Sequence, residues 1–419
     1  MAAARFSALR SAFANRNYAI YISFNALSLI GFWMQRIAVG WLAWEVSHSE
    51  FWVGAVAFAD ISPLMIVGPL FGVWADRFNR KTLAVILQSL MMLQSLALFV
   101  VIISDTLTIG WLFSLALAEG IIQAAYQPVR LSLIPSLVRK QDLVAAAAFT
   151  AVSFNVARFV GPGIAAGVMM LYSPAWVVLF NALSYCFIVL AWRYIHLPPQ
   201  VINPVARQSI IKDMLAGWLY ITQRPALRAM FILLTIIALF ARPLTFMLSA
   251  FVGAVFMAGP ETLALLTVSV GAGAIIAGLR LSMVGSTQGL IRNILLSTLV
   301  TVVTLGWFAS TDNKWLAAAL IFGFGYSVTV SAVASQTLVQ NTVDDVMRGR
   351  VLSIWVAFTR GAPALGVLII GWFSNLYGLQ WPNVAAACLC FIGVLLMVKQ
   401  RRQMRSYFEQ EPETVPEKP

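Results

Sequence analysis

The chain has 419 residues, of which 60% are hydrophobic and only 11% charged, whereas a soluble domain carries about 25% charged residues. This composition excludes a water-soluble globular protein. Apolar runs long enough to cross a hydrocarbon core of about 30 Å recur along almost the whole sequence. The net charge of +12 does not indicate nucleic-acid binding, because the basic residues fall at intervals between apolar runs. The sequence therefore predicts an all-α membrane protein.

Charged residues, Gly and Pro mark the boundaries of twelve predicted spans. In chain order they cover 17–44, 51–75, 82–104, 108–129, 143–171, 174–194, 229–254, 261–283, 290–309, 315–340, 351–376 and 380–399. Residues 1–16 lack a cleavage-site pattern, so we expect a cytoplasmic arm and not a signal peptide. The glutamates and prolines near the end of 401–419 predict a disordered cytoplasmic tail.

Basic residues between the spans are sorted to one side. Almost all of them fall on the side of the two termini, and Lys314 is the exception on the other side. Lys and Arg near span ends resist translocation, so this asymmetry places both termini in the cytoplasm.

One long hydrophilic connection, 198–228, separates two predicted six-helix bundles, 17–197 and 229–400. Within it, apolar residues recur at helical spacing and oppose polar ones. The apolar set is Ile210, Ile211, Met214, Leu215, Trp218 and Leu219, and the polar set is Lys212, Asp213 and Gln223. This pattern predicts a helix lying in the inner membrane interface. A simple tether is the alternative.

A faint internal repeat falls where two six-span halves would put it. The segment 158–162 (RFVGP) in span five is similar to 360–363 (RGAP) in span eleven. Matched interrupted helices in two halves favour a transporter with its site between the halves. Chance similarity is the alternative.

The connection between spans two and three reads GVWADRFNRK over residues 72–81. It resembles the signature loop of the major facilitator superfamily, with departures at Trp74 and Asn79. The resemblance implies two pseudo-symmetric six-helix bundles that work by alternating access. It also implies a cytoplasmic latch, made of Gly72, Asp76, Arg77, Arg80 and Lys81. Asn79 stands where the signature has Gly. We expect this departure to matter little, since Asn is the residue that best tolerates a left-handed backbone after Gly. A plain topology anchor is the alternative.

Two further segments resemble exporters of this superfamily. Gly161, Pro162 and Gly167 in span five match a Gly-Pro segment that implies a bent helix, although ordinary small-residue packing is the alternative. The phrases IPSLV at 134–138 and QNTVDDVMRGR at 340–350 resemble the enterobactin-exporter branch, which implies a bacterial inner-membrane protein. The superfamily's span-four arginine is not matched, because Arg130 is predicted too near the inner end.

Six charged residues are predicted deep inside spans: Asp60, Glu119, Arg36, Arg158, Arg242 and Arg360. Each such residue costs about 2.5–3.5 kcal/mol at a helix centre, so we expect them to face a wet cavity or one another. The two acids are candidates for proton coupling. Four arginines against two acids favour an anionic or zwitterionic substrate. Salt bridges that only fix helix positions are the alternative.

Aromatic residues on the same spans add candidates for the cavity wall, namely Trp33, Tyr126, Phe154 and Tyr326. The favoured function is a monomeric, proton-coupled exporter of an anionic or amphipathic small molecule such as a siderophore, with no cofactor and no metal. Broad drug efflux and lipid transport are the alternatives within transport. A non-transporting sensor is a further alternative. A membrane-embedded enzyme is disfavoured, because the spans hold no histidine and no cysteine beside an acid.

Overall fold

The computed structural model describes residues 13–68, 71, 78–197, 210–283 and 288–409, and every regular element within these ranges is helical. Eleven of the described helices are long and apolar enough to cross a membrane. The helix α3 (Glu50–Ile66) supplies the twelfth crossing, because its 17 described residues reach the lower limit for a span. The predicted all-α architecture of twelve transmembrane helices in two bundles is confirmed.

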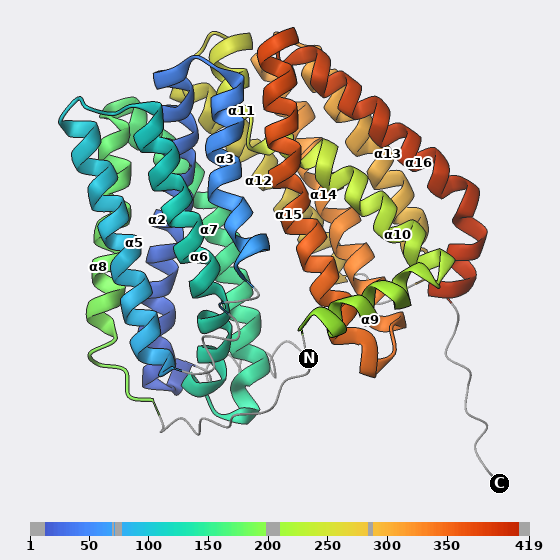
Figure 1. Cartoon of the computed structure of the whole chain (residues 1–419), viewed down its shortest axis with the longest axis horizontal. Coiled ribbons are helices and arrows are strands. Elements are labelled where there is room, and N and C mark those ends of the chain that lie inside the picture. Colours follow the sequence, from blue (N-terminus) through green and yellow to red (C-terminus); the bar gives the residue numbers. More distant parts are fainter. Residues whose placement is uncertain (1–12, 69–70, 72–77, 198–209, 284–287, 410–419) are drawn as a thin grey trace.

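The first six crossings form the N-terminal bundle. Besides α3, they are α2 (Arg16–Ser47), α5 (Arg80–Ile103), α6 (Ile109–Leu137), α7 (Leu143–Leu171) and α8 (Pro174–Ala191). The helix α2 packs against both α7 and α8, and α3 packs against α6. Figure 1 shows this bundle in blue to green.

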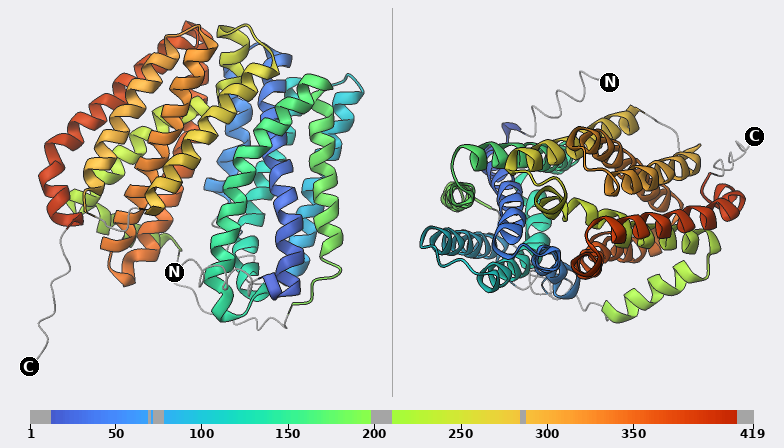
Figure 2. Two further views of the ribbon diagram at one scale, coloured as in Figure 1. Left: turned by 180° about the vertical axis from the view of Figure 1, so that it is seen from behind. Right: turned by 90° about the horizontal axis from the view of Figure 1, so that it is seen from above.

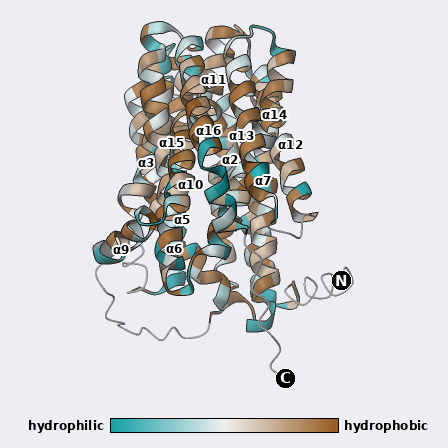
Figure 3. Ribbon diagram, turned by 90° about the vertical axis from the view of Figure 1, so that its right-hand side faces the viewer, coloured by the Kyte–Doolittle hydropathy of each residue, from teal (hydrophilic) through white to brown (hydrophobic). Residues whose placement is uncertain are grey.

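The last six crossings form the C-terminal bundle. The first of them is a broken span that begins with α10 (Pro225–Ile236), and the others are α12 (Pro260–Met283), α13 (Leu290–Ala309), α14 (Lys314–Thr342), α15 (Asp345–Tyr377) and α16 (Gln380–Phe408). Figure 3 shows hydrophobic residues along most of the length of the helices, as surfaces in contact with lipid require.

The seventh span is interrupted, whereas the sequence predicted a continuous helix over 229–254. After α10 come a π-helical turn η2 (Ile237–Ala241), a 3-10 turn η3 (Arg242–Thr245), the short α11 (Leu248–Ala250) and a second π-helical turn η4 (Phe251–Val255). Pro243 lies at the break, where it has no N–H to donate and disfavours the preceding helical turn. Span seven therefore has irregular backbone at the depth where Arg242 lies.

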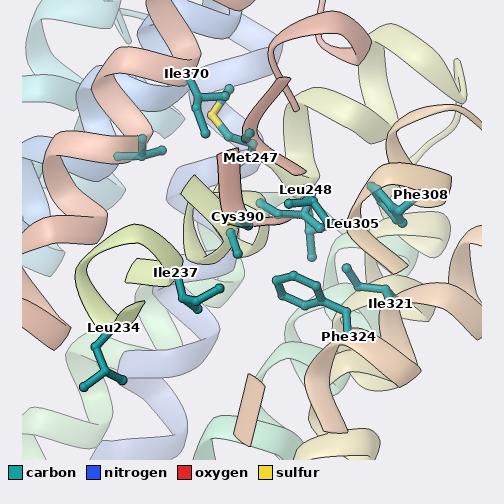
Figure 4. Packing of buried hydrophobic residues seen from close by; sticks show 14 of the residues in the cluster. Leu234, Ile237, Met247, Leu248, Leu305, Phe308, Ile321, Phe324, Ile370 and Cys390 are labelled. Atoms are coloured by element: carbon teal, nitrogen blue, oxygen red, sulfur yellow. The ribbon is translucent and has the colours of Figure 1, made fainter. Parts of the chain in front are cut away.

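Large apolar side chains surround this break. Leu234, Ile237, Met247 and Leu248 from span seven, Leu305 and Phe308 from α13, and Ile321 and Phe324 from α14 are all less than 9% exposed (Figure 4). Irregular backbone is tolerated at membrane depth only where protein or a wet cavity covers it. The packing of α13, α14 and α16 on the broken span meets that condition.

The two bundles meet at the upper end of Figure 1 and diverge toward the lower end, where α2 begins and α16 ends, and Figure 2 shows the same arrangement from behind. The contact runs along α3 and α15 and along α7 and α12. A Cβ added at Gly54 would lie 2.6 Å from the carbonyl oxygen of Val367, and one at Gly371 would lie 2.9 Å from that of Glu50. Small residues therefore let the upper halves of α3 and α15 approach closely.

A buried polar network holds the N-terminal bundle together. The amide of Asn181 in α8 donates to Gln35 Oε1 in α2 at 2.9 Å, and Gln35 donates to Gln94 Oε1 in α5 at 3.1 Å. Gln94 in turn donates to the carbonyl of Leu115 in α6 at 3.0 Å. Four helices are thus joined by side chains that are nearly all satisfied within the bundle.

The connection between the bundles contains α9 (Ile210–Thr222), which crosses the lower end of the C-terminal bundle in Figure 1. Asp213 pairs with Arg350 of α15 at 2.7 Å, and the hydroxyl of Tyr220 donates to Asp344 Oδ2 at 2.8 Å. Burial raises the pKa of Tyr220 above its ordinary value of 10.0, so this hydroxyl keeps its proton at neutral pH. One face of α9 is therefore bound to the C-terminal bundle.

The opposite face of α9 is apolar and exposed. Met214, Leu215, Trp218 and Leu219 are 45%, 62%, 46% and 56% exposed. This amphipathic division has the form of a helix that lies at a membrane surface.

The last helix extends beyond its predicted end at 399, into the segment predicted to be a disordered tail. The helix α16 continues to Phe408, and Met404 and Phe408 are only 0% and 5% exposed. Glu409 accepts the N–H of Ile291 at 2.9 Å, at the start of α13. The prediction of disorder is therefore wrong for residues 401–409, because apolar side chains at helical spacing pack this extension against the bundle.

Candidate functional site

The charges predicted at membrane depth gather where the two bundles face each other. The guanidinium of Arg36 in α2 pairs with Asp60 Oδ2 in α3 at 2.8 Å, and their side chains are 24% and 15% exposed. The same guanidinium lies over the rings of Trp33 and Phe246, 5.4 and 5.2 Å from their centroids. Phe246 belongs to the broken span seven, so Arg36 contacts both bundles near mid-depth.

Glu119 of α6 lies behind this ion pair and is 5% exposed. Its Oε1 accepts from Gln123 at 3.3 Å and from the hydroxyl of Tyr185 at 3.4 Å. Its Oε2 has no hydrogen-bond partner in the described part of the chain. Gly120 lets α6 sit against α3, since an added Cβ would lie 2.5 Å from the carbonyl oxygen of Asp60. The two acids therefore occupy adjacent positions on neighbouring helices and interact electrostatically.

Arg158 of α7 also contacts Trp33, with its guanidinium 5.5 Å from the indole centroid. The indole of Trp33 is thus shared by two arginines, Arg36 and Arg158. Gly161 permits this, because an added Cβ would lie 2.8 Å from the Cβ of Trp33. The arginines predicted on spans one and five are brought together as expected.

The C-terminal bundle contributes two arginines. Arg242 lies at the break in span seven and donates to the carbonyl of Thr359 in α15 at 2.7 Å. Arg360 is exposed, and no hydrogen bond or ion pair of its side chain occurs among the described residues. Arg242 is bonded to the residue just before Arg360, and it lies four residues before Phe246, whose ring Arg36 contacts. All four predicted arginines therefore belong to one electropositive region.

The aromatic candidates divide into two groups. Trp33 and Phe154 contact each other, with centroids 5.8 Å apart, in the arginine region. Tyr126 is 6% exposed inside the N-terminal bundle and accepts a hydrogen bond from Gln88 at 2.7 Å. Tyr326 is hydrogen-bonded to Arg280, within the C-terminal bundle. Only the first group lies among the arginines of both bundles.

Arg130 is a member of the region that sequence reasoning missed. Its guanidinium lies 5.6 Å from the ring centroid of Phe154, its Nη2 donates to Gln127 at 3.1 Å, and it interacts electrostatically with Arg360 across the bundles. Its sequence position predicts a place too near the inner end, but a long side chain reaches well beyond its backbone position. The sequence signal that could have identified this member is an arginine on span four, because the superfamily places that span at the cavity.

The predicted latch is described in part, because Gly72, Asp76 and Arg77 lie outside the described residues. Lys81 donates to the carbonyl of Ile195 at 2.6 Å, and Arg80 to that of Ser132 at 3.5 Å. These bonds join the first turn of α5 to the lower ends of α8 and α6.

Asn79 has φ −63°, and its side chain accepts from the backbone N–H of Lys81 and Thr82 at 3.0 and 3.1 Å. The expectation of a left-handed backbone there is wrong. Asn79 is the N-cap of α5.

The predicted interruptions of spans five and eleven are also wrong. Both α7 and α15 run as α-helix through Pro162 and Pro363. Gly161 serves a close helix contact, whereas a Cβ added at Gly167 would meet nothing within 4 Å in the described part of the chain. The interruption falls in span seven instead, at Pro243.

Two six-helix bundles joined by one long connection, with charged side chains at membrane depth between them, define a transporter of the major facilitator superfamily. The chain belongs to the family described as "Transmembrane secretion effector", which matches residues 7–418. Its relatives are transporters, and they act on small molecules.

Similar sequences include the staphyloferrin A transporter of Staphylococcus aureus (strain NCTC 8325 / PS 47), 24% identical over 390 residues that cover 92% of this chain and 97% of that protein. The enterobactin exporter EntS of Shigella boydii serotype 4 (strain Sb227) is 24% identical over 383 residues, which cover 90% of this chain and 89% of that protein.

Solved structures with the same fold include the nucleoside transporter NupG, with a TM-score of 0.74, 12% identity and coverage of 92% of this chain and 99% of that one. A bacterial homologue of the iron transporter ferroportin in an inward-facing state has a TM-score of 0.71, 14% identity and coverage of 92% and 98%.

Proposed function

We propose that the protein is a proton-coupled exporter of an anionic small molecule of the siderophore class, working by alternating access in a bacterial cytoplasmic membrane. Lys and Arg near span ends favour the cytoplasmic side, so the lower end of Figure 1 faces the cytoplasm. The contact of α3 with α15 at the upper end then closes the outer side, and the site receives substrate from the cytoplasm.

The observation that carries the proposal is the sign of the charge between the bundles. Among the described residues, five arginines, at positions 36, 130, 158, 242 and 360, lie there with two carboxylates, those of Asp60 and Glu119, and Arg36 alone is ion-paired with one of them. Isolated charges at membrane depth are expensive, so an unbalanced set of cations marks a functional site. An anion with acidic groups would balance the excess, and guanidinium forks bind such groups in two-point fashion.

Proton coupling is supported by the surroundings of the two acids. Asp60 is held by Arg36, whereas Glu119 is more deeply buried and leaves Oε2 without a partner in the described residues. A buried carboxylate with an unpaired oxygen is destabilised, and taking up a proton removes that charge. We propose that Glu119 takes up the proton. We also propose that Arg36 leaves Asp60 and binds the substrate during transport.

The siderophore class and the direction of transport are proposed from the relatives. The names of two of them specify staphyloferrin A and enterobactin, and one is called an exporter. Aromatic rings beside the arginines, such as Trp33 and Phe154, also favour amphipathic molecules. Broad amphipathic efflux is therefore the second candidate.

A flux assay in proteoliposomes with an imposed pH gradient tests the proposal, using staphyloferrin A, enterobactin and a cationic dye as substrates. Wild-type protein is expected to move an anion against its gradient when the opposite compartment is acidic, and Asp60→Asn or Glu119→Gln to abolish the response to pH. Glu45→Gln is the matched control, since Glu45 is exposed at the upper end of α2. If the two buried-acid variants kept the full pH response, proton coupling through them would be refuted.

The arginine region is tested in the same assay by Arg36→Ala, with Arg193→Ala, at an exposed position just after α8, as its control. Loss of anion transport in the first variant alone supports the proposal. Preferential transport of the cationic dye by wild-type protein would instead favour broad efflux.

A further inference from the structure

A continuous series of arginine and aromatic side chains runs from the mid-depth ion pair toward the lower end. Arg36 lies over Trp33 at 5.4 Å, Trp33 contacts Phe154 at 5.8 Å, and Phe154 lies under Arg130 at 5.6 Å. Arg158 adds the third guanidinium of the series and is the second over Trp33, at 5.5 Å. We call these five side chains the arginine ladder.

Helix geometry accounts for the ladder. Trp33 and Arg36 are three residues apart on α2, and Phe154 and Arg158 are four apart on α7, so each pair shares one helix face. Arg130 follows Glu119 by 130 − 119 = 11 residues on α6, which places it about 16 Å further along the axis at 1.5 Å per residue. The ladder therefore has an upper guanidinium beside Asp60 and a lower one well below it.

Arg130 differs from an ordinary basic anchor at a membrane surface. Its side chain is partly buried, packs on an aromatic ring and faces the electrostatic field of Arg360 from the other bundle. No acid pairs with it among the described residues, and its Nε has no hydrogen-bond partner there. A guanidinium stacked on a ring keeps its N–H edge free for a carboxylate or a similar planar acid.

The two ends of the ladder offer different conditions to an anion. Arg36 already has a carboxylate partner, Asp60, whereas within the described ranges the side chain of Arg130 is hydrogen-bonded to the neutral amide of Gln127 and to no carboxylate. An incoming acidic group therefore meets no competing carboxylate of the described chain at the lower end, and must displace Asp60 at the upper end. Capture at Arg130 first would hold a second acidic group close to Arg36, which raises its effective concentration there.

We propose that Arg130 and Phe154 form a second, lower anion subsite, and that the substrate is an elongated molecule with at least two acidic groups that bridge Arg130 and Arg36. This proposal rests on the proposed export of an anion and adds the number and spacing of its charged groups. It assigns Arg130 a role in substrate specificity.

Binding of simple probes to the purified full chain tests the proposal. The probes are linear α,ω-dicarboxylates of increasing length and their monomethyl esters, and the measurement is the dissociation constant by titration calorimetry. Dicarboxylates long enough to span the ladder are expected to bind at least about ten-fold more tightly than their monoesters, because the ester lacks one charge-assisted contact. Equal affinity for diacids and monoesters at every length would overturn the proposal.

Variants locate the second contact. Arg130→Gln is expected to raise the dissociation constant of the long dicarboxylates about ten-fold and that of the monoesters less than about two-fold. Arg130→Lys keeps the charge but not the planar fork and should recover part of the loss. Arg139→Gln, at an exposed position beyond the end of α6, is the matched control and should change neither.

The outcomes separate the two proposals. If Arg36→Ala abolished binding of every probe while Arg130→Gln weakened diacids and monoesters equally, the lower subsite would be wrong and anion binding at the upper site would stand. If wild-type protein bound no carboxylate in this series, or if Arg36→Ala and Arg130→Gln both bound them normally, the ladder proposal would be overturned. A pH-driven flux of anions in the separate transport assay would then still support export.

Discussion

The substitution Gly54→Ala is expected to disfavour closure of the upper end. The added Cβ would lie 2.6 Å from the carbonyl oxygen of Val367, whereas ordinary contacts begin at 3.4 Å, so α3 and α15 would have to separate by about 0.8 Å. Overpacking of this kind costs about 1–3 kcal/mol. Under the proposed alternating access this contact is broken when the upper end opens, so the closed state should lose about 5–150-fold in population relative to the open one.

Related substitutions should follow the same geometry. The Cβ of Gly371→Ala would lie 2.9 Å from the carbonyl oxygen of Glu50, a shortfall of about 0.5 Å, so its effect should be smaller. Gly167→Ala on α7 is the matched control, since nothing lies within 4 Å of its added Cβ in the described part of the chain. The expected order of upper-end opening is Gly54→Ala, then Gly371→Ala, then Gly167→Ala with no change.

Spin labels on two exposed serines at the upper end measure this order. Ser104 follows α5 and Ser310 follows α13, so Ser104→Cys and Ser310→Cys report the distance between the bundles after the three native cysteines are replaced. Pulsed electron resonance should show a longer distance gaining population in Gly54→Ala. If Gly54→Ala and Gly167→Ala gave the same distance distribution, the argument that the α3–α15 contact sets the closed state would be refuted.

Three other substitutions test local features of the fold. Asn79→Ala removes the N-cap of α5 and should lower the free energy of unfolding by about 1 kcal/mol, measured in detergent by denaturant titration. Asn181→Ala leaves Gln35 Oε1 unpaired in the buried network and should cost about 1–3 kcal/mol in the same measurement, and no change would contradict the assigned hydrogen bond. Asp213→Asn weakens the half-exposed pair with Arg350 by less than about 1 kcal/mol, and should speed hydrogen exchange in α9 while leaving α10 unchanged.

Much of the fold could be predicted because the signals are local. A run of apolar residues needs a bilayer whatever its neighbours are, and the sorting of basic residues sets the side of each loop. The deep positions of Arg36 and Asp60 could be predicted for the same reason, since residue spacing along a helix converts directly into depth.

The wrong predictions of helix interruption concern positions where packing between distant segments decides whether a helix continues. The sequence placed the interruptions at Pro162 and Pro363, yet α7 and α15 continue through both prolines, whereas span seven breaks at Pro243. Each span contains a proline, so proline content alone does not distinguish them. The surrounding contacts determine whether the lost hydrogen bond is absorbed within a helix or the helix breaks.

The sequence by itself determined the number of spans, the amphipathic connection and the unusual charges at membrane depth, because hydropathy and charge act at each residue independently of its partners. Only the tertiary structure decided which charges are paired and which are available. Arg36 is held by Asp60 of the next helix, Glu119 has one unpaired oxygen among the described residues, and Arg130 joins the ladder through Phe154. These relations depend on distances between side chains on different helices, which residue spacing along one helix does not specify.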